Sequence, residues 1–175
     1  MAGPVLTPIP AASVIVLRDA PLEVLLLRRS EKSSFVPNAW VFPGGAIEAD
    51  ERAAEAAVRE TREECGIELD SDALVLTSRW ITPEGIPKRF DTWFFLARVA
   101  RETVVTIDGG EIVESMWIAP KDVLARRDLR LVLPTIKNLE AIAAFDSVAA
   151  LIDSRRGAVV EPIQPVLVDG RPVLR

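Results

Sequence analysis

Three glutamates in the segment 40–69, Glu60, Glu63 and Glu64, have the chemistry and spacing of a cation site. At 100° per residue they fall together on one side of a helix, opposite an apolar stripe. That stripe is formed by Ala54, Val58, Thr61 and Cys65. Glu60 and Glu64 are one turn apart and repel each other. A hard divalent cation such as Mg²⁺ would relieve this repulsion, because it takes carboxylate oxygens and keeps waters for substrate phosphates.

The alternative is an ordinary solvated acidic face, with arginines of the same helix as partners. Two features argue against it. The three glutamates lie in the C-terminal half of the helix, where the macrodipole disfavours anions. The segment also opens with Gly44 and Gly45, where the backbone can approach a ligand closely. The residues alone therefore predict a divalent metal site for a phosphorylated ligand.

The spacing of this segment resembles the signature of the Nudix hydrolase family. The matching positions are Gly45, Glu51, Arg59, Glu60, Thr61, Glu63, Glu64, Gly66 and Ile67. Thr61 is the one departure, because an aliphatic residue is usual there. The resemblance implies an α/β fold, the Nudix α/β/α sandwich with a mixed sheet and a loop-helix box at 45–67. It also implies a single Nudix domain over 1–175, with a C-terminal helix and hairpin in 134–175.

The resemblance assigns a role to each box residue. Glu60, Glu63 and Glu64 would bind Mg²⁺ or Mn²⁺, with the Gly44 carbonyl as a further ligand. Arg59 would orient this cluster, and Glu51 would brace the loop against the helix. Gly45 and Gly66 would be structural. The implied reaction is attack of an activated water on one phosphorus of a diphosphate bridge.

A carboxylate must accept the proton of that water, because the chain contains no histidine. Glu111, six residues before Trp117, is the candidate for base and further metal ligand, since relatives often place a glutamate at this distance before a tryptophan. Glu114, Glu84 and Glu63 are the alternatives.

The substrate implied by the resemblance is a nucleoside diphosphate derivative. Arg28, Trp80, Arg89 and Phe90 are candidates for binding it, since aromatic rings and arginines suit a base and a phosphate. The strands around the box resemble the peroxisomal coenzyme A diphosphatase branch, which implies coenzyme A or acyl-coenzyme A. ADP-ribose, NADH and dinucleoside polyphosphates are alternatives. A sensor that binds a nucleotide without hydrolysis is a different class, but such proteins generally lose a box glutamate.

Several elements must position these residues. The patterns predict strands at 11–19, 22–29, 41–45, 73–81, 91–99 and 112–119. They predict helices at 51–65, 120–128 and 134–155. Asp50 is the expected N-cap of the first helix, which Gly66 ends. Asp169 and Gly170 predict a hairpin turn within 165–174.

Composition limits the remaining classes. A chain of 175 residues suits one domain, and the net charge of −5 disfavours nucleic acid or an anionic membrane as partner. No apolar run approaches the roughly 20 residues of a membrane span, so we expect a cytoplasmic protein. The lack of histidine excludes Ser-His-Asp catalysis and His-ligated zinc. Cys65, the only cysteine, is expected to be a packing residue. A homodimer is compatible with the sequence, which does not require one.

Overall fold

The computed structural model, which describes residues 5–175, is built on a mixed β-sheet. Its strands are β1 (Ile9–Arg18), β2 (Glu23–Arg29), β3 (Trp40–Val41), β4 (Gly44–Ala46), β5 (Val75–Ile81), β6 (Phe90–Arg98), β7 (Ile112–Ile118) and β8 (Pro162–Ile163). The order is β3-β2-β1-β6-β5-β8, while β4 pairs with β1 and β7 pairs with β2. β1 is parallel to β6 and antiparallel to β2 and β4. The central strand β1 therefore pairs with three other strands, β2, β4 and β6.

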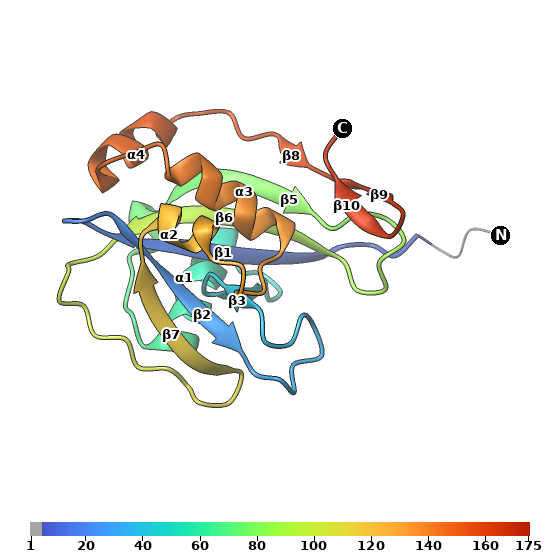
Figure 1. Ribbon diagram of the computed structural model, residues 1–175, viewed down its shortest axis with the longest axis horizontal. Helices are drawn as coiled ribbons and strands as arrows, with labels where there is room; N and C mark the ends of the chain where they lie inside the picture. The colour runs from blue at the N-terminus through green and yellow to red at the C-terminus, as the bar shows by residue number, and fades with distance from the viewer. Residues whose placement is uncertain (1–4) are drawn as a thin grey trace.

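Helices cover both faces of this sheet (Figure 1). They are α1 (Ala53–Cys65), α2 (Pro120–Ala125), α3 (Leu133–Ile142) and α4 (Val148–Arg155). Val14 and Val16 of β1 share a core with α1, whereas Ile15 and Leu17 share a core with α2, α3 and α4. Successive strand residues point to opposite faces, so the middle of β1, residues 11–17, is almost wholly apolar because both of its faces are buried there. The structure confirms the predicted α/β/α sandwich.

Two predicted helices differ from the structure. The first starts at Ala53 rather than Glu51, and Asp50 is not its N-cap but lies in a turn with φ of 63°. The expected helix 134–155 is two helices. Ser147 begins α4 by accepting a hydrogen bond from the Ala150 amide at 3.2 Å, and Asp19 accepts one from the Val148 amide at 2.9 Å. These two caps start a new helix where the sequence pattern reads as continuous.

The C-terminal hairpin is present as predicted. It pairs β9 (Val166–Val168) with β10 (Arg171–Val173) as a separate two-stranded sheet. Asp169 and Gly170, both with positive φ, form its turn. Within residues 5–175, no helix has the length and apolar character needed to cross a bilayer.

Candidate metal centre and adjoining pocket

The glycine loop lies against the backbone of β1 on one side and against a side chain of α1 on the other. Ser13 of β1 lies opposite Gly44 of β4, and a Cβ on Gly44 would overlap the Ala12 carbonyl oxygen. A Cβ on Gly45 would stand 2.5 Å from Cδ of Glu60. Side chains at these two positions would therefore push the loop away from the sheet or from the helix.

Arg59 ties the loop to the helix. Its Nε donates to Glu51 Oε1 at 2.9 Å and its Nη2 donates to Glu51 Oε2 at 3.1 Å. The same Nη2 donates to the Ala46 carbonyl at 3.0 Å, and Nη1 donates to Glu60 Oε1 at 2.7 Å and to Glu63 Oε2 at 3.4 Å. The hydrogen bonds that Arg59 donates to Glu51 raise the pKa of Arg59, so the guanidinium stays charged. One side chain thus connects the loop, the helix and two of the acidic groups.

Glu64 is a buried carboxylate, which sequence reasoning did not anticipate. It is 5% exposed, and the Gly44 amide donates to its Oε2 at 3.0 Å. Burial raises the pKa of Glu64 to about 8, and Glu60 and Glu111 add to this rise, while the Gly44 amide and Arg29 oppose it. The charged form is disfavoured unless a cation accompanies it.

The buried face of α1 is therefore rotated about the helix axis relative to the predicted apolar stripe. Ala54 and Val58 are half-buried, while the fully buried residues include Ala57, Thr61 and Glu64. Glu64 follows Ala57 by seven residues and Thr61 by three, so it shares their face of the helix. The prediction that Glu64 stands clear of the buried face was therefore wrong. Cys65 is buried as predicted, and burial raises the pKa of its thiol to about 11.

The acidic groups of α1 and Glu111 form one electrostatic cluster. Burial raises the pKa of Glu60 against the effect of Arg59, and Glu63 and Glu111 raise it further. Within residues 5–175, no three acidic side chains stand in the arrangement of ligands around one metal ion. Their donor chemistry nevertheless fits a hard divalent ion, because all are carboxylates and neighbouring glutamates raise the pKa of Glu60 and Glu64.

The structure separates the alternatives to Glu111. Glu111 follows the turn at Gly109 and directly precedes β7. Its carbonyl accepts a hydrogen bond from the amide of Ser30, just after β2, at 2.8 Å. Glu114 is instead paired with Arg28 at 2.8 Å on exposed parts of β7 and β2. Glu84 is exposed in the loop between β5 and β6. Of these three glutamates, Glu111 is the one that perturbs both Glu60 and Glu64.

A pocket of about 410 Å³ adjoins the glycine loop. Its walls combine Gly44 and Gly45 with residues of several segments that are far apart in the sequence. Among them are Phe35, Phe42, Trp80, Phe90, Leu133 and Pro134. Trp80 and Phe90, predicted from the sequence as binding residues, both line it. Phe35, Phe42 and the start of α3 were missed, and no local pattern marks them, because the fold alone brings them together.

The two predicted arginines, Arg28 and Arg89, do not line this pocket. Arg28 binds Glu114 and donates to Asn38 Oδ1 at 3.2 Å. Arg89 is 5% exposed and donates to the backbone carbonyls of Thr82 and Leu6 at 3.0 and 2.6 Å, so it braces the chain. Arg29 lines the pocket instead. Adjacent strand residues point to opposite faces, so the strand register selects Arg29 over Arg28.

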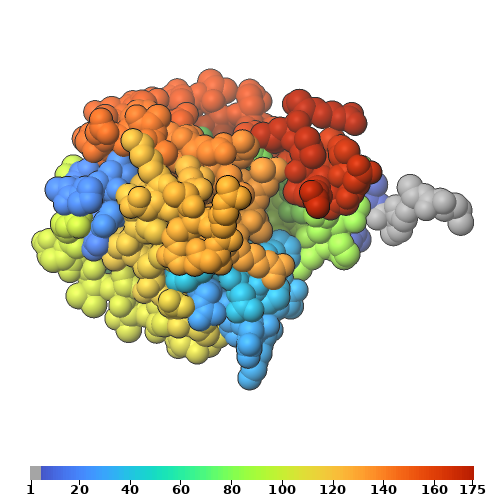
Figure 2. Space-filling model, viewed as in Figure 1, coloured from blue at the N-terminus to red at the C-terminus, as the bar shows by residue number. Residues whose placement is uncertain are grey.

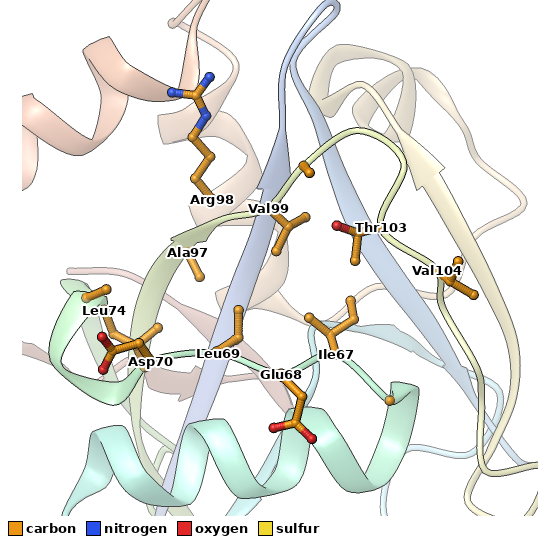
Figure 3. A pocket seen from close by; sticks show the side chains of 13 residues that line it. Ile67, Glu68, Leu69, Asp70, Leu74, Ala97, Arg98, Val99, Thr103 and Val104 are labelled. Carbon is orange, nitrogen blue, oxygen red and sulfur yellow. The ribbon is translucent and has the colours of Figure 1, made fainter.

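A second pocket, of about 400 Å³, lies beyond the C-terminal end of α1. Figure 3 shows Ile67, Leu69 and Val99 around it, while Arg98 extends away. Arg98 pairs with Asp19 at 2.9 Å. None of the clustered glutamates of α1 or Glu111 lines this pocket. These glutamates do not line the larger pocket either, but Gly44 and Gly45 of its wall lie directly against Glu64 and Glu60.

Comparison with known proteins agrees with this geometry. The family model described as NUDIX domain matches residues 7–137. A NUDIX hydrolase structure from Alicyclobacillus acidocaldarius superposes with a TM-score of 0.75 at 25% identity, covering 84% of this chain and 96% of that one. The chain belongs to the Nudix family, and its sheet, flanking helices and loop-helix are those of Nudix hydrolase structures.

Individual relatives are similar over part of their length. "Putative nudix hydrolase 7" of Caenorhabditis elegans is 29% identical over 152 residues, which are 64% of this chain and 52% of that protein. The m7GpppN-mRNA hydrolase NUDT17 of Danio rerio is 30% identical over 118 residues, 59% of this chain and 39% of that protein. The acyl-coenzyme A diphosphatase NUDT19 of Xenopus laevis is 69% identical over 29 residues, 17% of this chain and 8% of that protein. The chain thus spans about half or less of these relatives.

Proposed function

We propose that this chain hydrolyses a diphosphate bond in a nucleoside diphosphate derivative, using divalent metal bound by glutamates of α1. The observation that carries this is the position of Glu60 and Glu64 against the glycine loop, where the Gly44 amide donates to Glu64 at 3.0 Å and a Cβ on Gly45 would stand 2.5 Å from Cδ of Glu60. Carboxylates that raise one another's pKa need a cation to be charged together. Membership of the Nudix family supports the same chemistry.

The metal ligands would be Glu60, Glu63 and Glu64, with the Gly44 carbonyl and Glu111 as further oxygen donors. Mg²⁺ or Mn²⁺ bound there would supply the charge that offsets phosphate oxygens and acidifies a water. Arg59 would orient Glu60 and Glu63 through its hydrogen bonds at 2.7 and 3.4 Å. Glu51 would hold Arg59 in place, and Gly45 and Gly66 would let the loop and the helix end take their shapes.

Proton transfer would fall to a carboxylate. Glu111 would accept a proton from the attacking water, whose oxygen forms a bond to one phosphorus as the bridging P–O bond breaks. The products are two phosphate monoesters. Glu111 is supported as base over Glu114 because Glu114 is committed to Arg28. Glu63 is the remaining alternative, since its carboxylate is half-exposed and bound to Arg59 only at 3.4 Å.

For the substrate we propose coenzyme A or acyl-coenzyme A. Support comes from the apolar pocket beside the glycine loop and from the short segment of similarity to an acyl-coenzyme A diphosphatase. ADP-ribose, NADH and dinucleoside polyphosphates are the alternatives. A capped dinucleotide joins them, because NUDT17 of Danio rerio is named as a cap hydrolase.

The test is a substrate panel with Mg²⁺ or Mn²⁺, comparing kcat/KM by chromatography of the products. Coenzyme A, acyl-coenzyme A, ADP-ribose, NADH, dinucleoside polyphosphates and a capped dinucleotide form the panel. We expect turnover that stops on addition of EDTA and falls sharply in Glu64→Gln. Glu68→Gln, at the remote second pocket, is the matched control and should keep wild-type rates. No turnover of any substrate would overturn the proposal and favour a binding protein.

A further inference from the structure

The C-terminal segment forms part of the wall of the larger pocket, although it lies beyond the residues matched by the family model. The match ends at residue 137, whereas Pro165 and Pro172 line the pocket. β8 runs parallel to β5 and places Ile163 opposite Trp80. The pocket is therefore shaped by residues beyond the matched segment as well as by those within it.

The hairpin is packed against the loop between β5 and β6. A Cβ built on Gly85 of that loop would stand 3.2 Å from Cδ1 of Leu167, so the two segments are in contact. Figure 2 shows the C-terminal hairpin, in red, against the green part of the chain that contains this loop. The contact fixes the side of the pocket away from the glycine loop.

The pocket has little capacity to read a polar ring. Phe35 and Phe90, with ring centroids 5.0 Å apart, contribute aromatic surface. The Ser13 hydroxyl donates to the Pro43 carbonyl at 2.8 Å, and the Thr82 hydroxyl accepts from the Phe90 amide at 3.0 Å. A nucleobase carries several donors and acceptors, and leaving them unpaired in an apolar site is costly.

Besides the Ser13, Thr82, Thr92 and Thr135 hydroxyls, two nitrogen-bearing side chains of the wall bear on the polar part of a ligand. The indole Nε1 of Trp80, a residue 4% exposed, is buried without a hydrogen-bond partner among the described residues. Arg29 donates to Ser33 Oγ at 2.6 Å and to the Phe35 carbonyl at 2.9 Å, both uncharged oxygens. Arg29 also lies near enough to Glu64 to act on its pKa. It can therefore meet a phosphate at the metal side of the pocket.

We propose that this pocket binds an apolar chain attached to the distal phosphate of the substrate, with Trp80 Nε1 donating to a carbonyl of that chain. The inference rests on the proposed function and defines its substrate class as a nucleoside diphosphate bearing such a chain. The nucleoside then lies outside this pocket. Burial of methylene groups supplies affinity, and the single indole donor selects a chain that carries an amide or ester carbonyl.

Binding of phosphate probes in EDTA tests the pocket without any hydrolysis. The probes are n-alkyl phosphates from butyl to octyl, 4′-phosphopantetheine, which carries amide carbonyls, and adenosine monophosphate. Affinity by calorimetry should rise about fourfold for each added methylene. Octyl phosphate should bind more tightly than adenosine monophosphate. Affinity that is independent of chain length, or tighter binding of adenosine monophosphate, would overturn the proposal.

Variants test the donor and the wall. Trp80→Phe should weaken 4′-phosphopantetheine about tenfold and leave octyl phosphate within about twofold, which also shows that the variant is folded. Trp93→Phe, on the neighbouring strand and outside the pocket, should change neither. Pro172→Glu should weaken octyl phosphate more than Val173→Glu, its exposed neighbour. Equal losses in the members of either pair would contradict the proposal.

The outcome is separable from that of the proposed function. Hydrolysis of ADP-ribose with no chain-length effect in EDTA would overturn this inference and leave the function standing. A clear chain-length effect without metal-dependent turnover would do the reverse.

Discussion

A Cβ on Gly45 would stand 2.5 Å from the carboxylate carbon of Glu60, so the glycine loop and α1 lie too close at this point for any side chain at residue 45. In the same loop, the Gly44 amide donates a hydrogen bond to Glu64 at 3.0 Å. The two glycines therefore set the positions of two proposed metal ligands as well as the path of the loop.

Gly45→Ala should impair activity more than stability. The methyl group forces Glu60 or the loop to move, and a displacement near 1 Å in a catalytic constellation costs about 100-fold in rate. Overpacking should cost about 1–3 kcal/mol of unfolding free energy. Steady-state kinetics with saturating Mg²⁺ and urea unfolding measure the two effects. Gly157→Ala is the control for activity: a Cβ there meets nothing within 4 Å, so kcat should be retained, while the φ of 68° costs some stability through backbone strain. Wild-type kcat in Gly45→Ala would refute the steric account.

Arg59→Lys should act as a disruptive change. The guanidinium binds Glu51 through two nitrogens while also reaching Glu60 and the Ala46 carbonyl, which one ammonium group cannot reproduce. We expect a loss of about 1–2 kcal/mol of unfolding free energy and a fall in kcat that exceeds the change in KM. Arg52→Lys changes an exposed arginine just before the start of α1, and it should leave the unfolding free energy and kcat unchanged. Equal behaviour of the two variants would remove the positioning role of Arg59.

Stability in the absence of metal should depend on the protonation of Glu64. A carboxyl whose folded pKa is raised from 4.5 to about 8 stabilises the fold fully below pH 4.5, and this contribution is lost as the pH rises through 8. Mg²⁺ competes with that proton, so it should raise the melting temperature more at pH 8 than at pH 6. Thermal unfolding with EDTA or Mg²⁺ at both pH values gives the comparison. A magnesium effect that does not change with pH would contradict the assignment of Glu64 as a ligand.

Glu111→Gln should lower kcat by about 10² to 10⁴ with a smaller change in KM, the usual range for losing a general base. Glu114→Gln, three residues along the chain, breaks only an exposed pair with Arg28 and should stay within about twofold of wild type. Rates for both variants across pH 6–9 provide the test. If Glu63→Gln instead shows the larger loss and Glu111→Gln is near normal, Glu63 is the base.

The sequence determined the local parts of this protein. Gly44, Gly45 and the glutamates of α1 lie within about twenty residues, so helical geometry and the motif spacing suffice to predict the metal chemistry and the fold. Gly66, with φ of 71°, ends α1 as predicted, because a left-handed backbone there depends on a single residue. Such features need no information from elsewhere in the chain.

Only the tertiary structure decided the rest. The burial of Glu64 depends on how α1 packs against β1 and β4, and the approach of Glu111 depends on the pairing of β7 with β2. The choice of Arg29 over Arg28 as pocket residue follows from strand register. The pocket joins the glycine loop, Trp80 and the C-terminal hairpin, which are distant in sequence. Long-range packing sets these relationships, and no local residue pattern encodes them.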